Sequence, residues 1–267
     1  DYLTIRRCEF LHVNPVIANN SYCAYPIQGG HNTHVVECRF ADMAVPYFAG
    51  KKMGGDFQFV SNRLVRCGGV TLYGGNYGDL PDGELAYNII VGEGKEPAIK
   101  RATLQNPNNG NWKVHHNTCI NVTSFIYSDA GKGCLNAWKP AIYDNLVILA
   151  EGGSMFYDTG TVDSATLPAS DSPFNEGASF GCNAYLAGFD FAAGYCTTLP
   201  GYDNATYLAK SNNVELASAP VFLSTDLDSD NAYRYKASQY PNLIPAKRDY
   251  IGAVAPIVAN GLFLYIR

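Results

Sequence analysis

Asn88-Ile89-Ile90-Val91, Asn117-Thr118-Cys119-Ile120 and Asn145-Leu146-Val147-Ile148 are three copies of one short pattern, and this pattern decides the fold. Eight such starts lie 25 to 38 residues apart, and the fourth position is apolar in all of them. A long, nearly constant period with short apolar runs is typical of a solenoid, in which each repeat stacks on the one before. The eight starts are Arg7, Glu37, Asn62, Asn88, Asn117, Asn145, Asn183 and Asn213.

The repeat predicts an all-β fold, a right-handed parallel β-helix of about eight rungs. Equivalent residues of successive rungs lie about 4.8 Å apart. We therefore expect the asparagines to form a hydrogen-bonded ladder, each in the left-handed conformation of a tight turn. We expect the apolar fourth position to point inward and form the core. The expected ladder consists of Asn62, Asn88, Asn117, Asn145, Asn183 and Asn213.

Two other repetitive or all-β folds fit the pattern poorly. A leucine-rich repeat needs a fixed leucine frame, which is missing. A β-sandwich would show hairpin loops and alternating faces instead of one ladder at a long period. We expect a single domain over residues 1–267, with rungs in 1–218 and a closing segment in 219–267.

The composition fits a folded chain without a basic surface. Of the 267 residues, 47% are hydrophobic and 16% are charged, which excludes a disordered chain. The net charge of −5 argues against nucleic acid as a partner. The longest uncharged run, from Tyr250 to Ile266, contains Pro256 and is too short to span a bilayer comfortably, so no membrane span is expected.

The eight cysteines contain no C-x-x-C pair, which argues against a zinc ribbon or a thioredoxin motif. Their even number favours at least one disulfide and an oxidising compartment, so we expect a secreted protein, extracellular or on the cell surface. Buried free thiols in the core columns are the alternative. The stretch Tyr2-Leu3-Thr4-Ile5 already has strand character, so the solenoid ends are candidate surfaces for self-association.

Three stretches near the C-terminal end carry a resemblance. They are Ala219-Pro220-Val221-Phe222, Asp230-Asn231-Ala232-Tyr233-Arg234-Tyr235 and Ile251-Gly252-Ala253-Val254-Ala255-Pro256. Together they resemble a recurrent ending of bacterial secreted right-handed β-helix proteins of the pectate-lyase-like superfamily. The last stretch is similar to a variant found in the Bacteroidetes lineage. The resemblance implies a secreted bacterial β-helix whose closing segment covers the C-terminal end of the solenoid, and it implies no catalytic residue.

Enzymes of two kinds use such a fold. A polysaccharide lyase needs a base to remove a proton and a cation to neutralise the uronate carboxylate. The nearest candidates are Lys113, His115, His116 and Arg66, for which a solvated turn is the alternative. A glycoside hydrolase needs paired carboxylates. Acidic residues in glycine-rich turns are candidates, although turn formation explains them equally well: Asp42, Asp56, Asp79, Asp82 and Glu84.

Two further sets of residues are candidates for binding. Tyrosines beside strands and glycines would stack on sugar rings or on a partner if exposed, and would cap core columns if buried. Carboxylates at alternate positions, Asp226, Asp228 and Asp230, are candidates for a calcium-binding loop, with a simple acidic turn as the alternative. We expect no other cofactor. The glycan-stacking candidates are Tyr73, Tyr77, Tyr127 and Tyr157.

We favour a non-catalytic extracellular structural or adhesive protein that binds glycans or assembles with copies of itself. The low charge and the lack of a convincing acid–base cluster favour this interpretation. The alternative is a carbohydrate-active enzyme, a polysaccharide lyase or a glycoside hydrolase. Its main support is analogy of fold, and a fold does not determine a function.

Overall fold

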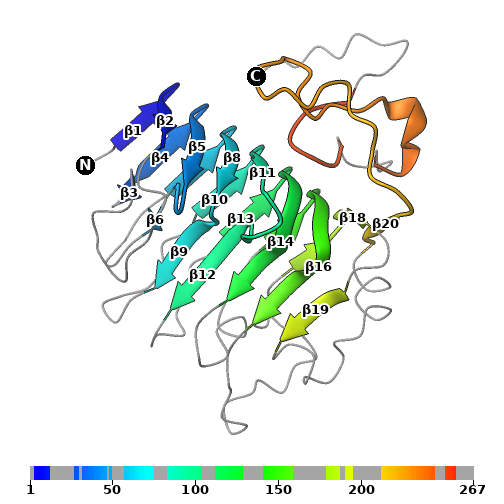
Figure 1. Cartoon of the computed structure of the whole chain (residues 1–267), viewed down its shortest axis with the longest axis horizontal. Helices are drawn as coiled ribbons and strands as arrows, with labels where there is room; N and C mark the ends of the chain where they lie inside the picture. Colours follow the sequence, from blue (N-terminus) through cyan, green and yellow to red (C-terminus); the bar gives the residue numbers. More distant parts are fainter. Residues whose placement is uncertain are drawn as a thin grey trace, which may run out of the picture.

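The structure, a computed structural model, describes residues 3–12, 27–29, 32–46, 48–49, 57–74, 83–103, 112–128, 141–158, 179–186, 190–194, 212–243 and 250–256. Over these residues the strands are parallel and stack turn upon turn, as Figure 1 shows. The prediction of an all-β parallel β-helix is therefore confirmed. The strands fall into three rows that run along the solenoid.

The first row is a seven-stranded parallel sheet. The repeat pattern does not predict it as a separate row, because the pattern marks one short apolar run in each turn. Its strands are β1 (Leu3–Arg6), β4 (Thr33–Val36), β7 (Phe57–Val60), β10 (Gly83–Ala86), β13 (Trp112–His115), β15 (Ala141–Tyr143) and β17 (Ser179–Gly181).

The second and third rows belong to one 13-stranded sheet, because β14 and β16 are long enough to bend from one row into the other. The second row contains β2 (Glu9–Leu11), β5 (Arg39–Met43), β8 (Arg63–Cys67), β11 (Ile89–Val91), β14 (Thr118–Ser128), β16 (Leu146–Asp158), β18 (Ala184–Leu186) and β20 (Val214–Leu216). The third row contains the ends of β14 and β16 together with β3 (Gln28–Gly29), β6 (Phe48–Ala49), β9 (Val70–Gly74), β12 (Ile99–Thr103) and β19 (Asp190–Gly194).

The number of turns differs from the eight expected repeats. Among the described residues, the first and third rows each contain seven strands, whereas the second row contains an eighth, β20. Within the part of the chain that the structure describes, the last repeat adds one strand, β20, to the second row. After it the chain leaves the solenoid direction.

The asparagine ladder is confirmed. The Oδ1 atom of Asn117 accepts a hydrogen bond from the backbone N–H of Asn88, at 3.1 Å. Its Nδ2 atom donates to Oδ1 of Asn145 at 2.9 Å and to the Leu85 carbonyl at 3.0 Å. The same pattern repeats from Asn62 to Asn183, and all these side chains are buried. Each amide therefore satisfies its donors and acceptors inside the solenoid wall, where water cannot reach them.

The left-handed conformation is predicted from the sequence for the ladder asparagines, but the structure places it at the residue before each of them. His116, with φ of 52°, precedes Asn117, and Asp144, with φ of 56°, precedes Asn145. The bend made by this residue leaves the asparagine backbone free to continue into the strand while its amide bonds along the stack. The left-handed residues that directly precede a ladder position are Arg7, Glu37, Ser61, Tyr87, His116, Asp144, Cys182 and Asn212.

The expected core column is also corrected. Side chains alternate along a strand, so an asparagine that points inward places the third position of the pattern inward and the fourth outward. Leu64 and Ile90 accordingly lie in the main core, whereas Val65 and Val91 lie outside the wall. The main core also contains Phe40, Phe57, Phe59, Trp112, Val114, Cys119, Phe125, Ile126, Ile142, Val147 and Phe156.

In the first two turns the register is one residue later than the repeat pattern suggests. Arg39 pairs with Arg63, and Glu9 pairs with Arg39. Cys8 and Cys38 therefore occupy the ladder position there, instead of Arg7 and Glu37.

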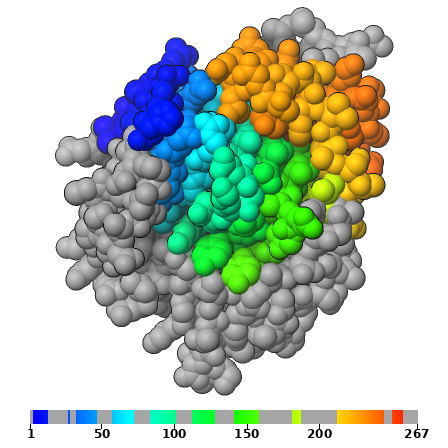
Figure 2. All heavy atoms as spheres, in the orientation of Figure 1, coloured from blue at the N-terminus to red at the C-terminus, as the bar shows by residue number. Residues whose placement is uncertain are grey.

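The described part of the segment after β20 folds back along the side of the stack (Figure 1), whereas the resemblance implies a segment that covers the C-terminal end. We call its described parts, residues 217–243 and 250–256, the strap; it contains the short 3-10 helices η4 (Ala237–Gln239) and η5 (Pro241–Leu243). In Figure 2 its gold and orange atoms lie over the cyan and green middle turns.

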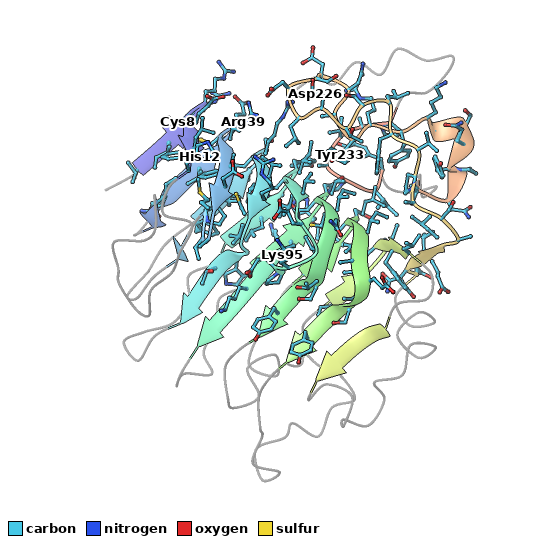
Figure 3. The ribbon with its side chains drawn as sticks, viewed as in Figure 1. Cys8, His12, Arg39, Lys95, Asp226 and Tyr233 are labelled. Atoms are coloured by element: carbon cyan, nitrogen blue, oxygen red, sulfur yellow. The ribbon has the colours of Figure 1, made fainter. Side chains whose placement is uncertain are left out.

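The strap buries the outer face of the second row. Tyr233, which points from the strap toward the sheet in Figure 3, packs with Ile89 in one cluster. Ile251 packs with Leu146 in a second. The backbone N–H of Ala253 donates to Oγ1 of Thr118 at 2.8 Å. At the fourth position of the repeat, Val91 packs against the first cluster and Ile148 against the second, so this cover explains why the position is apolar there.

The five described cysteines are free thiols, so the expected disulfide is not formed among them. Cys38, Cys67 and Cys119 are buried, which matches the alternative of thiols in the core columns. The remaining three, Cys23, Cys134 and Cys196, lie outside the described residues. In the described part of the chain, no helix is long and apolar enough to cross a membrane.

Candidate functional site

The structure brings two of the lyase candidates together with a carboxylate. Nε2 of His115 lies 2.9 Å from Oε1 of Glu84, and Nδ1 of His115 lies 2.9 Å from Nδ1 of His116. Glu84 lies on β10, one turn before β13, where the sheet register pairs it with Lys113; His115 lies two residues further along β13, on the same face. The hydrogen bond from His115 lowers the pKa of the Glu84 carboxyl below its usual value, which keeps that group ionised at neutral pH.

Aromatic rings enclose this histidine pair. Tyr143 stacks on His115 with ring centroids 4.8 Å apart, and Tyr87 stacks on His116 at 4.9 Å. Tyr250 of the strap contacts His116 edge-on at 5.2 Å. His115 and His116 are only 6% and 8% exposed. The pair is therefore packed beneath the strap and does not face a binding groove.

The other two lyase candidates do not complete an acid–base site. Lys113 is exposed on β13, and its side chain faces away from the core. Arg66 lies in β8, in the other sheet, and forms an ion pair with Asp42. Arg66 thus lies in the other sheet, apart from the other three candidates, whereas Lys113 lies on the same face of β13 as His115 and pairs in register with Glu84.

A pocket lies at the corner where the second row meets the third. Its floor combines apolar residues, and its rim is charged. The pocket has a volume of about 280 Å³ and is open to solvent. We call it the corner pocket; it is lined by Asp42, Met43, Ala44, Arg66, Cys67, Gly68, Glu93, Lys95 and Glu96.

The rim charges of the corner pocket are largely paired with one another. Nη2 of Arg66 lies 2.8 Å from Oδ2 of Asp42, and Nε of Arg66 also donates to this carboxylate. The hydrogen bond from Arg66 lowers the pKa of Asp42. Lys95 lies 3.4 Å from a carboxylate oxygen of Glu93. The Cys67 thiol at the floor is buried, which raises its pKa to about 12 and makes it a poor nucleophile.

An aromatic row lies on the outer face of the third row. Tyr127 and Tyr157 pair in successive turns, and their rings stack with centroids 5.4 Å apart and planes 2° from parallel. Nζ of Lys100, one turn earlier, lies 5.6 Å from the centroid of Tyr127. Tyr157 is 36% exposed. Two of the four predicted stacking residues thus form a surface strip, which we call the tyrosine row.

The other two stacking candidates, Tyr73 and Tyr77, have no described side chain. Tyr73 lies in β9, and its backbone pairs with Ala102, but its side chain lies outside the described part. Tyr77 lies outside the described residues.

The aspartates proposed for calcium do not converge. Oδ1 of Asp226 accepts the backbone N–H of Asp228 at 2.9 Å, as in a turn. Oδ1 of Asp228 binds Nη1 of Arg39 at 2.8 Å and fixes the strap to the second turn. Asp230 bonds to neither. Among the described residues, no three His, Cys, Asp or Glu side chains come together as a metal site.

Comparisons of the chain with models of protein families, with curated proteins and with solved structures find no match.

The sequence pattern does not predict the corner pocket. Glu93, Lys95 and Glu96 resemble an ordinary charged loop until the register places them beside Arg66. One signal points to this loop: two glycines, Gly92 and Gly94, interrupt the run directly after β11. A Cβ atom at Gly92 would lie 2.6 Å from the Asn121 carbonyl oxygen, so the loop lies tightly against the next turn.

Proposed function

We propose that this protein is a non-catalytic extracellular structural or adhesive solenoid that binds glycans through its tyrosine row. The observation that carries the proposal is the stack of Tyr127 and Tyr157 with Lys100 beside it, on an outer face. The faces of the two tyrosine rings can stack on the C–H face of a sugar ring. The tyrosine hydroxyls and the lysine ammonium, which lie in line along the solenoid, can bind its oxygen atoms. The resemblance of the stretches between Ala219 and Pro256 to the ending of pectate-lyase-like β-helix proteins supports a secreted bacterial member of that superfamily.

The enclosure of the histidine pair favours binding over catalysis. A general base must reach a proton of the substrate, whereas His115 and His116 are covered by tyrosines from three elements. Arg66, the candidate for charge neutralisation, is engaged by Asp42. A lyase or hydrolase would therefore need the strap to move away.

Affinity electrophoresis against a panel of neutral and acidic polysaccharides tests the proposal. The chain should be retarded by at least one polysaccharide, and the double variant Tyr127→Ala and Tyr157→Ala should lose this retardation. Val221→Ala, at an exposed strap residue, is the matched control and should behave as the wild type. Retention of full binding by the double variant would contradict the assignment to the tyrosine row.

The same polysaccharides should be assayed for new reducing ends and for unsaturated products. We expect neither. Depolymerisation that is lost in His115→Gln, with the fold intact by circular dichroism, would replace the binding proposal with the enzyme alternative.

Self-association through the solenoid ends is the second part of the proposal. Leu3 and Leu11, on β1 and β2, are 49% and 46% exposed. Among the described strands, β1 and β2 each pair on one side only, and the edge of a sheet is a surface to which a further strand can add. Electron microscopy should show end-to-end assemblies that Leu3→Asp and Leu11→Asp disrupt; monomers at all concentrations would contradict this part.

A further inference from the structure

The corner pocket has an apolar floor and a polar rim. Met43 and Cys67 at the floor are buried, whereas Lys95 and Glu93 at the rim are exposed. Figure 3 shows Lys95 on a loop that passes in front of the strands, away from Cys8 and His12 of the first turn. This combination of an apolar base with polar edges is typical of small-molecule sites.

The pocket is held in shape by the backbone. Asp42 and Arg66 are left-handed residues, with φ of 56° and 49°, at equivalent corners of successive turns. This conformation projects both side chains outward, side by side. Gly68 is required at the floor, because a Cβ atom there would lie 1.8 Å from the Ala44 carbonyl oxygen. A ligand would therefore meet a largely preformed surface, which lowers the entropic cost of binding.

Three backbone hydrogen bonds fix the wall formed by residues 92–97 to the next turn. Gly92 N–H donates to the Ile120 carbonyl at 2.8 Å, and Gly94 N–H donates to the Asn121 carbonyl at 2.8 Å. Thr123 N–H donates to the Glu96 carbonyl at 3.0 Å. The wall is thus part of the solenoid's hydrogen-bonded structure.

The charges of the rim decide which ligand fits. Three carboxylates and two cations line the pocket, so an anion meets a net negative rim. A metal ion is not favoured, because no three ligating groups converge in the described part of the chain. The planar Arg66–Asp42 pair still offers N–H groups and oxygen lone pairs at its edge, which match neighbouring hydroxyl groups.

We propose that the corner pocket binds a single neutral sugar ring, with its C–H face on the floor and its hydroxyls on the Arg66–Asp42 pair and on the 92–97 wall. The volume of about 280 Å³ lies at the lower end of small-molecule pockets, which suits one ring better than a chain. The proposal adds a second sugar position to the proposed glycan-binding function, at a place separate from the tyrosine row.

Chemical-shift perturbation of the isotope-labelled chain, titrated with glucose, galactose, mannose, glucuronic acid and glucosamine, tests this site. At least one neutral hexose should shift resonances of Gly68 and of residues 92–97, with a Kd on the order of 1 mM. Arg66→Ala should weaken that binding about tenfold or more. Arg66→Lys, which keeps the charge but loses the two-nitrogen fork, should weaken it as well.

Two controls separate this proposal from the proposed function. Tyr157→Ala should leave hexose binding at the corner pocket unchanged, and circular dichroism should show that Arg66→Ala remains folded. If no neutral hexose shifts the pocket resonances, or if glucuronic acid binds there more tightly, the pocket proposal is wrong, whatever the polysaccharide assays show. If hexoses bind the pocket but the tyrosine row binds no polysaccharide, only the proposed function fails.

Discussion

The first two turns and the middle turns of the solenoid use the same backbone but hold it together differently. In the middle turns the ladder position is asparagine, and the outward residues of the second row, such as Ile89 and Leu146, are buried under the strap. In the first two turns the ladder position is Cys8 and Cys38, and the outward residues are Glu9 and Arg39. The strap reaches this region through the ion pair between Arg39 and Asp228.

The difference shows which parts of the repeat depend on a neighbour. Under the strap, outward residues of the second row such as Ile89 and Leu146 are buried, whereas Leu11, an outward apolar residue of the first turn, is 46% exposed. The Cys38 thiol donates to the Ile5 carbonyl at 3.6 Å, in the place where Nδ2 of Asn62 donates to the Val35 carbonyl at 3.0 Å. A thiol therefore makes a weaker version of the bond that the ladder makes in the following turns.

The largest expected effect comes from breaking the ladder in a middle turn. Asn117→Ala removes the acceptor for Asn88 and the donor for the Leu85 carbonyl, and both partners are buried. Each buried group left without a partner costs about 1–3 kcal/mol, so we expect a loss of about 3–6 kcal/mol in the free energy of unfolding. Urea denaturation measures it.

The matched variant in the second turn is Cys38→Ala. It removes one weak thiol contact and a small buried volume, and we expect a loss of about 1 kcal/mol. Equal losses for Asn117→Ala and Cys38→Ala would show that the ladder contributes nothing beyond packing.

The next largest difference in stability is expected between a strap residue and an outward residue of the first turn. Ile251→Ala should cost about 2–5 kcal/mol, because Ile251 is fully buried against Leu146 and beside Tyr235. Leu11→Ala, on the exposed outer face of the first turn, should change stability by about 0.5 kcal/mol or less. Thermal unfolding of both variants measures the difference, and a Leu11→Ala effect as large as that of Ile251→Ala would indicate a cover over the first turn.

The stacked turns and the asparagine ladder are predicted from the sequence because both depend on the same residue types recurring at a nearly constant spacing. The sequence does not predict which side of the wall the fourth position faces. A valine such as Val91 would fit either an inward column or an outer face covered by the strap. Only the inward direction of Asn88, three residues earlier in the chain, shows that Val91 faces outward. The corner pocket is likewise missed, since Arg66 and Lys95 come together through stacking and a loop, not through spacing in the sequence.

Cys38→Asn should extend the ladder by one turn. The amide Nδ2 would reach the Ile5 carbonyl and Oδ1 of Asn62, which already accepts the backbone N–H of residue 38 at 2.9 Å. Because one to two better hydrogen bonds replace a thiol contact, we expect a gain of about 1 kcal/mol. Amide hydrogen exchange of the first two turns should slow. Destabilisation with faster exchange would show that the site cannot accommodate the amide.

The smallest effect concerns the ion pairs that join the first turn to the second. Hydrogen bonds from Arg6 and then Arg7 lower the pKa of Glu37 to about 2. A lowered folded pKa means that this stabilisation is complete above about pH 4.5, the ordinary value, and is lost as the pH falls toward about 2. Glu37→Gln should therefore reduce stability at pH 7 but not at pH 2.

The size of the Glu37→Gln effect is limited by solvent. The two arginines are more than half exposed, so screening keeps the loss at pH 7 to about 1 kcal/mol or less. High salt should reduce the loss further, whereas Asn117→Ala should be insensitive to salt and to this pH range, because its groups are neutral and buried. If the loss in Glu37→Gln did not depend on salt, it would not come from exposed ion pairs. That result would contradict the distinction between first turns joined by charges and middle turns joined by amide hydrogen bonds.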